Sequence, residues 1–265
     1  MHSFSITELR EEQLRVLDSV NMYCTSMGIR YSLACGTLLG AIRHKGYIPW
    51  DDDIDIYMRR DEYERFVRSF PEVYENVKLI SMERSKKWNR AYAKAYSCDT
   101  ICEEDAQGDL AIGVNIDVYP VDDVPDEEQK WLSYNRKRRL LQRLYEAKII
   151  RISKSRSIRR NLVLLFTKAL LIPFTIRNMA HIVSYYAQIN NNKGYNHSFE
   201  CVQGMLQKHC FNKSLFNDIK PVKFEDREYL AFADYETYLR NAYGDFMKLP
   251  PEEKRRPHHF HAYRK

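Results

Sequence analysis

Apolar and polar positions along the N-terminal half of the chain alternate with two periods, one typical of helices and one typical of strands. Ser5 and Glu8 have the spacing of a capping box. Apolar residues then recur at helical spacing up to Gly28, a natural helix terminator. The pattern therefore predicts a long N-terminal helix that ends at Gly28.

The same reading, continued along the chain, predicts short strands among helices. Pro120 and Pro125 are expected to end this mixed region, with Asp122 and Asp123 as turn formers before Pro125. The expected fold is α/β (α+β), with a mixed-sheet core and a helical C-terminal portion. In chain order, the predicted elements are strand 29–35, helix 36–43, strand 53–58, helix 61–70, strands 78–82, 90–96 and 114–119, a helical segment over 126–186 and a helix near 235–243.

Length allows one large domain or one domain with a helical extension. The chain has 265 residues, of which 44% are hydrophobic and 29% charged. We expect a catalytic core over 1–125, a variable basic helical region over 126–200, and a segment over 201–265 that packs on the core.

Charge is distributed unevenly. Residues 136–160 carry 11 Lys or Arg and one acid, a net +10, whereas the whole chain carries +6, so the rest carries −4. The apolar stretch 162–176 follows, but it is too short for a transmembrane helix, which needs roughly 20 apolar residues. It fits either an interfacial helix docked on anionic lipid or a core helix beside a solvated basic face.

Targeting and cysteine patterns add little. The chain begins without a secretory signal, so we expect a cytoplasmic protein, with any membrane contact peripheral at the inner face through 136–160. The six cysteines form no dense scaffold, and a zinc site from Cys98, Cys102, Cys201 and Cys210 has weak spacing support. Nucleic-acid binding is not expected, because one face of the basic segment is apolar.

The acidic run Asp51-Asp52-Asp53-Ile54-Asp55 is the strongest chemical signal. Such a cluster is often a solvated surface turn. On a strand, however, Asp53 and Asp55 would share one face, with Ile54 and Ile56 on the other. Two carboxylates on one face suit Mg²⁺ (or Mn²⁺) that holds substrate phosphates.

Two further features extend this pattern. Gly36 and Thr37 precede a helix whose N-terminus could bind phosphate, and Arg43 follows within reach. Asp117 lies on the predicted strand 114–119, on the face opposite Val118, where it could accept a proton or act as a third metal ligand. This ordered set is typical of nucleotidyltransferases.

The sequence from Tyr31 through the acidic run to Ile56 resembles the signature of the LicD family, which includes phosphocholine transferases of bacterial glycans and the animal protein fukutin. The resemblance continues through Asn115-Ile-Asp117 and the tail that starts at Tyr243. It implies a nucleotidyltransferase-like fold, and transfer of a phospho-alcohol from a CDP-alcohol donor to a glycan acceptor, either lipid-linked or free, with release of CMP. It also implies site residues: Asp53, Asp55, Asp51 and Asp117 for metal and catalysis, and Gly36, Thr37, Arg43, Lys94, Lys248 and His258 for the donor.

Alternatives remain at this stage. Lys94 fits a surface strand as well as a donor cleft, and His258 fits a solvated tail. For the whole chain, the rivals are nucleotidyl transfer to an acceptor and an inactive membrane-surface binding module.

Overall fold

The N-terminal helix is built as its sequence predicts. In the computed structural model, which describes residues 3–103, 110, 112–153, 156–203, 209–255 and 261–265, helix α1 spans Ile6–Met27. Ser5 and Glu8 form the reciprocal capping box, and Gly28 ends the helix with φ 61°, a left-handed conformation that suits glycine. The buried face of α1 packs against the central sheet, so the predicted helix is confirmed.

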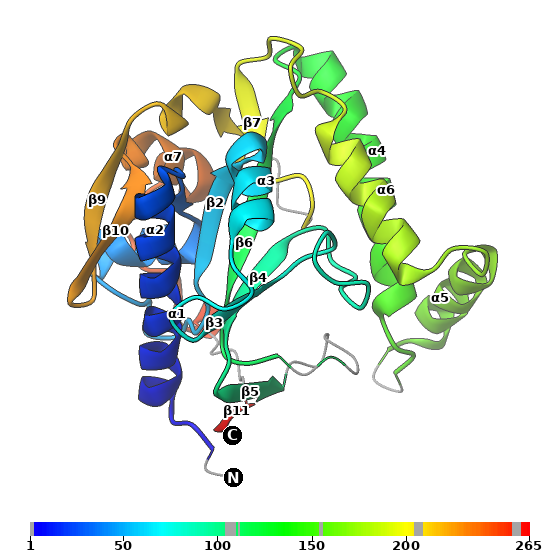
Figure 1. Cartoon of the computed structure of the whole chain (residues 1–265). Coiled ribbons are helices and arrows are strands. Elements are labelled where there is room, and N and C mark those ends of the chain that lie inside the picture. Colours follow the sequence, from blue (N-terminus) through cyan, green and yellow to red (C-terminus); the bar gives the residue numbers. More distant parts are fainter. Residues whose placement is uncertain (1–2, 104–109, 111, 154–155, 204–208, 256–260) are drawn as a thin grey trace.

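A mixed sheet forms the centre of the molecule (Figure 1). Its path is β1-β2-β6-β4-β3, and β7 and β8 extend it beside β6. Strands β2 and β6 are parallel, whereas the other pairs are antiparallel. The bounds are β1 Ser32–Leu33, β2 Asp55–Arg59, β3 Val77–Ile80, β4 Ala93–Ser97, β6 Asn115–Val124, β7 His197–Phe199 and β8 Phe211–Asn212.

Helices surround the sheet and extend from it. Helices α1 and α3 pack on the sheet, and α2 contacts both β2 and β9 (Ile219–Phe224). Helices α4 and α6 run side by side, and α5 lies at their far end (Figure 1). The helix bounds are α2 Cys35–Arg43, α3 Arg60–Ser69, α4 Glu128–Ile149, α5 Ile158–Leu170, α6 Ile176–Gln188 and α7 Tyr235–Tyr243.

Two small sheets complete the fold. A hairpin pairs β9 (Ile219–Phe224) with β10 (Arg227–Phe232), and β11 (His261–Arg264) pairs with β5 (Thr100–Glu103). Short 3-10 helices span Lys213–Phe216 and Glu252–Lys254. The backbone N–H of Phe4 donates to the carbonyl of Ala262, so both ends of the chain lie together. The expected mixed α/β class is confirmed, and the three-part domain division stays a prediction.

The prediction that Pro120 ends the strand region is wrong, because β6 continues to Val124. On one side, β6 pairs with β4 up to Val118 and with β7 from Asp122 onward. Pro120 lies where the neighbour on that side changes, and a residue that lacks an N–H is tolerated at such a gap in the ladder.

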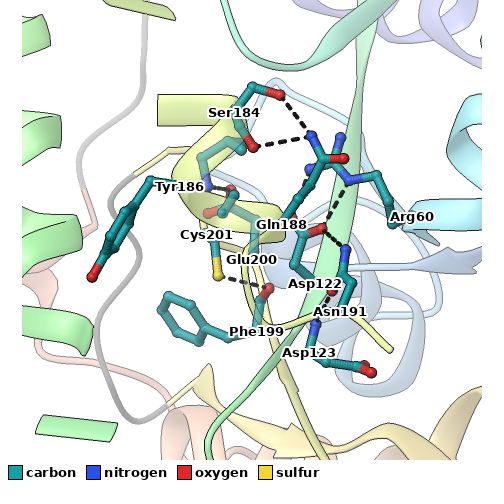
Figure 2. Close-up of polar contacts among 12 residues, drawn as sticks. Arg60, Asp122, Asp123, Ser184, Tyr186, Gln188, Asn191, Phe199, Glu200 and Cys201 are labelled. Carbon is teal, nitrogen blue, oxygen red and sulfur yellow. Dashed lines mark hydrogen bonds and ion pairs between the residues drawn. The ribbon is translucent and has the colours of Figure 1, made fainter. Parts of the chain in front are cut away.

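Asp122 and Asp123 are therefore strand residues and not turn formers. The guanidinium of Arg60 donates from Nε to Asp122 Oδ1 at 2.8 Å and from Nη2 to Oδ2 at 2.6 Å (Figure 2). Asn191 Nδ2 donates to the same carboxylate, and the Asn191 side-chain oxygen accepts the backbone N–H of Asp123. This buried network joins β6 to the start of α3 and to the segment that follows α6.

Candidate active site

The register of β2 and β6 brings two predicted acids together. These strands are parallel neighbours, and Asp55 is directly paired with Asp117. The backbone N–H of Asp117 donates to the carbonyl of Ile54 at 2.8 Å. Because paired residues of adjacent parallel strands project to the same face, about 4.8 Å apart, the two carboxylates lie side by side.

Asp53 belongs to the site, but it is not part of the strand as predicted. Strand β2 begins at Asp55 and not at residue 53, so Asp53 lies in the extended segment before the strand. It nevertheless lines the same cavity as Asp117. Ile54 and Ile56 are buried, as the alternation predicted.

Asp51 packs against the first turn of α2. A Cβ added to Gly36 would lie 2.5 Å from Asp51 Oδ2, so only glycine permits this approach without displacing the carboxylate. Burial raises the pKa of Asp51, and the neighbouring charge of Asp52 raises it further.

Thr37 positions the acidic strand. Its hydroxyl oxygen accepts the backbone N–H of Asp55 at 2.9 Å, and the side chain is buried. The backbone N–H of Ala34 in turn donates to the Asp55 carbonyl. Donor binding by Gly36 and Thr37 stays a prediction, whereas their contacts with Asp51 and Asp55 are direct.

Lys94 is a buried residue of the site. It is 5% exposed, and its Nζ lies 2.8 Å from Asp117 Oδ1 while donating to Asn115 Oδ1 at 2.7 Å. Tyr119 donates its hydroxyl to Asp117 Oδ2 at 2.6 Å. Asp117 is thus held at both oxygens, and the alternative of a surface lysine is wrong.

Negative charge outweighs positive charge around Asp55. Burial raises the pKa of Asp55 well above its usual value, and the charges of Asp53, Asp117 and Asp51 raise it further, against the opposing effect of Lys94. A cation bound here would relieve this repulsion.

The carboxylates of the site suit a metal whose remaining ligands come from water and substrate. Within the described ranges, no three His, Cys, Asp or Glu side chains group tightly enough to hold a metal on their own. Mg²⁺ commonly uses one or two carboxylates, with waters and substrate phosphates as its other ligands. Asp53 and Asp55 fit that pattern. The zinc hypothesis gains no support, because among the described residues the four cysteines form no group of three or more metal-ligating side chains.

A cavity of about 200 Å³ opens beside these residues. Its lining includes Asp53, Asp117 and Lys94, together with Arg90, Tyr92 and Gln203. The volume is below the roughly 300–1,000 Å³ of pockets that enclose a drug-sized ligand, so a nucleotide donor would extend beyond it. The two cationic side chains, Arg90 and Lys94, suit a phosphate group.

Arg43 contacts the main chain around Lys248, and neither residue is among the described residues that line this cavity. Arg43 Nη1 donates to the carbonyls of Phe246 at 2.9 Å and Lys248 at 3.4 Å. The Lys248 residue itself is exposed. His258 lies outside the described residues. Donor contacts by these three residues stay predictions.

Several residues of the site were not singled out from the sequence. Asn115 and Tyr119 share a strand face with Asp117, so the period-2 alternation could have identified them. Burial raises the pKa of Tyr243, and so does the neighbouring Cys35. The negative charges of the acids of the site raise this pKa further, which places Tyr243 near them. Its place near the site depends on a tertiary contact from α7, which no local pattern indicates.

The chain is similar to a known protein over most of its length. Residues 28–145 match the family model described as LicD/FKTN/FKRP, nucleotidyltransferase domain. The chain is 34% identical to the lipopolysaccharide cholinephosphotransferase LicD of Haemophilus influenzae over 265 residues, covering 95% of this chain and 96% of that protein.

Shorter similarities occur in two uncharacterised proteins. The protein from Rickettsia prowazekii is 38% identical over 61 residues, 23% of each chain. The protein from Rickettsia typhi is 44% identical over 48 residues, 18% of this chain and 16% of that protein. The match to the Haemophilus protein spans nearly the whole of both chains, so the chain belongs to the LicD family of phosphotransferases.

Proposed function

We propose that this protein transfers phosphocholine, or a closely similar phospho-alcohol, from a CDP-alcohol to a hydroxyl of a surface glycan such as lipopolysaccharide, with release of CMP. The observation that carries the proposal is the pairing of Asp55 with Asp117 beside a cavity that also contains Asp53 and Lys94. The near full-length similarity to a lipopolysaccharide cholinephosphotransferase supports the choice of group and acceptor.

Asp53 and Asp55 would hold Mg²⁺ or Mn²⁺. The metal, when bound, would neutralise charge on the diphosphate and on the departing CMP. Arg90 and Lys94 place two further positive charges in the cavity, where they bind and orient the phosphate groups.

Asp117 is assigned to receive the proton of the attacking hydroxyl. The acceptor oxygen forms a bond to the phosphorus that carries the alcohol, the bond from that phosphorus to the bridging oxygen breaks, and CMP leaves with that oxygen. Lys94 and Tyr119 hold the Asp117 carboxylate in place. Each of these contacts uses one lone pair of an oxygen, so the carboxylate keeps lone pairs with which Asp117 would serve as a third metal ligand.

The test is a thermal-shift and product assay with defined nucleotides. We expect CDP-choline with Mg²⁺ to raise the melting temperature, because ligands that bind the folded state stabilise it. Asp53→Asn should lose this shift, whereas Asp61→Asn should keep it, because the Asp61 side chain is 73% exposed on α3. A wild-type protein that shows no shift with CDP-choline, other CDP-alcohols or CMP would contradict the proposal.

Nucleotidyl transfer is the second candidate, because the matching family model describes a nucleotidyltransferase domain. The same acids would serve if the acceptor attacked the other phosphorus of the donor. Mass spectrometry of the modified acceptor separates the two reactions, since a phospho-alcohol and a CMP group add different masses.

A further inference from the structure

Helix α5 shows its apolar side chains to solvent. Its inner face contacts the rest of the chain through the buried Leu164, through Lys168, whose Nζ donates to the Lys148 carbonyl at 3.0 Å, and through Asn161, whose Nδ2 donates to the Ser153 carbonyl at 2.9 Å. This is the reverse of an ordinary surface helix, whose apolar stripe faces the core.

The outer face forms an apolar strip, with Arg159 as the polar exception in the first turn of the helix. At 100° per residue, its side chains fall within an arc of about 160°. Phe166 is 66% exposed and Leu170 is 63% exposed, and the following Ile172 is 76% exposed. Contiguous exposed apolar patches mark sites of interaction. On the helix itself, the strip consists of Ile158, Leu162, Val163, Leu165, Phe166 and Leu170.

The charge around the strip is of one sign. Residues 147–199 contain nine Lys or Arg and no Asp or Glu, although the whole chain has 36 acids. Arg151 precedes the helix, Arg159 and Arg160 lie in its first turn, and all three are exposed. A second copy of this chain would bring the same positive charge to the contact, whereas an anionic lipid surface is complementary to it.

The length of α5 determines how it would lie. Its 13 residues span about 20 Å, less than the roughly 30 Å of a bilayer core. No described helix is long and apolar enough to cross a membrane. An apolar strip flanked by arginines is suited to lie in the plane of the interface.

We propose that α5 docks this protein on an anionic lipid surface, with the strip inserted among the acyl chains and the arginines at the headgroups. Helix α5 extends beyond the ends of α4 and α6, away from the β9–β10 hairpin, where no described element lies outside it (Figure 1). The surface is therefore accessible to a bilayer.

The docked helix is mechanically connected to the cavity. Arg177 of α6 donates to the carbonyls of Met82 and Ser85, and Tyr145 of α4 donates to the carbonyl of Asn89. These carbonyls belong to the segment between β3 and β4, which carries Arg90 into the cavity. Lipid docking would thus hold this side of the cavity toward the membrane, where a lipid-linked acceptor would be met.

The experiment is co-sedimentation of the full chain with vesicles of phosphatidylcholine mixed with phosphatidylglycerol, and of phosphatidylcholine alone. We expect binding to the mixed vesicles only, and weaker binding as ionic strength rises from about 0.1 M to 1 M, which shortens the Debye length from roughly 10 Å to 3 Å. The triple variant Leu162→Ser, Phe166→Ser, Leu170→Ser should bind roughly tenfold more weakly or worse.

A control variant removes three exposed apolar side chains elsewhere. Ile6, Met22 and Val73 are 49%, 47% and 48% exposed, and their replacement by Ser should leave vesicle binding unchanged. Equal binding by the α5 variant, or no binding by the wild type, would overturn the proposal. So would a wild-type dimer that the α5 variant abolishes, without vesicle binding, because the strip would then contact a second copy.

This test is independent of the proposed reaction. The α5 variant should keep the Mg²⁺-dependent thermal shift with CDP-choline, because the substituted side chains lie outside the cavity lining. Loss of vesicle binding with an unchanged shift therefore separates the two proposals.

Discussion

Replacement of Asp55 by Asn should stabilise the metal-free protein while it abolishes metal-dependent donor binding. The backbone contacts of residue 55 with Thr37 and Ala34 involve main-chain atoms of that residue, so Asn preserves them. What changes is the side-chain charge, which faces Asp53 and Asp117 in a buried group of acids.

The magnitude follows from the arrangement of the charges. Two unit charges about 5 Å apart interact by roughly 3 kcal/mol at an effective dielectric constant near 20. Asp55 experiences repulsion from three acids and attraction to Lys94. The raised pKa of Asp55 favours its uncharged form, which offsets part of this repulsion, so we expect Asn to raise the free energy of unfolding by about 1–2 kcal/mol.

Urea unfolding in a chelator-containing buffer measures the stability change, and a thermal shift with CDP-choline and Mg²⁺ measures ligand binding. Asp61→Asn is the control, since its exposed carboxylate should change neither quantity appreciably. A destabilised Asp55→Asn protein would refute the repulsion argument. A retained metal-dependent shift would refute the assignment of Asp55 to the metal.

Three further substitutions test other parts of the structure. Lys94→Met should lower the rate of CMP release from CDP-choline by roughly 100-fold, because it removes a cation from the cavity, whereas Lys78→Met, a strand lysine outside the cavity lining, should not. Asp122→Asn should cost about 3–5 kcal/mol in urea unfolding, because it leaves the buried Arg60 guanidinium without its charged partner; a cost below about 1 kcal/mol would contradict this. Burial raises the pKa of Glu200 from 4.5 to about 7, so the folded carboxyl keeps a proton that the unfolded chain loses, and wild-type stability should fall as pH rises across that window. Glu200→Gln should flatten this fall and be more stable near pH 8, by up to about 3 kcal/mol; identical pH profiles in urea unfolding would argue against it.

The sequence carried enough local information to predict most helices of this protein. Ser5, Glu8 and Gly28 specify the two ends of α1 through hydrogen bonds and backbone conformation within a few residues. The alternation around Ile54 and Ile56 likewise identified the strand that carries Asp55, although its first residue was misplaced by two positions.

Strands whose pairing or turns lack a local signal were not predicted. The β9–β10 hairpin turns at Glu225 and Asp226, with Glu225 at φ 56°, and neither position has the Gly or Asn that usually marks such a turn. Strand β11 pairs with β5, which lies more than a hundred residues away in the chain. The course of β6 through Pro120 depended on the exchange of β4 for β7 as its neighbour.

The chemistry of the site divides in the same way. The sequence by itself determined which acids are present and, through the alternation of strand residues, which face Asp55 and Asp117 occupy. Only the tertiary structure decided that Asp117 lies beside Asp55, that Lys94 is buried against Asp117, and that the apolar strip of α5 faces outward. The physical reason is that strand register and burial are set by contacts between segments far apart in the chain, whereas caps and periodicity depend on neighbours within a few residues.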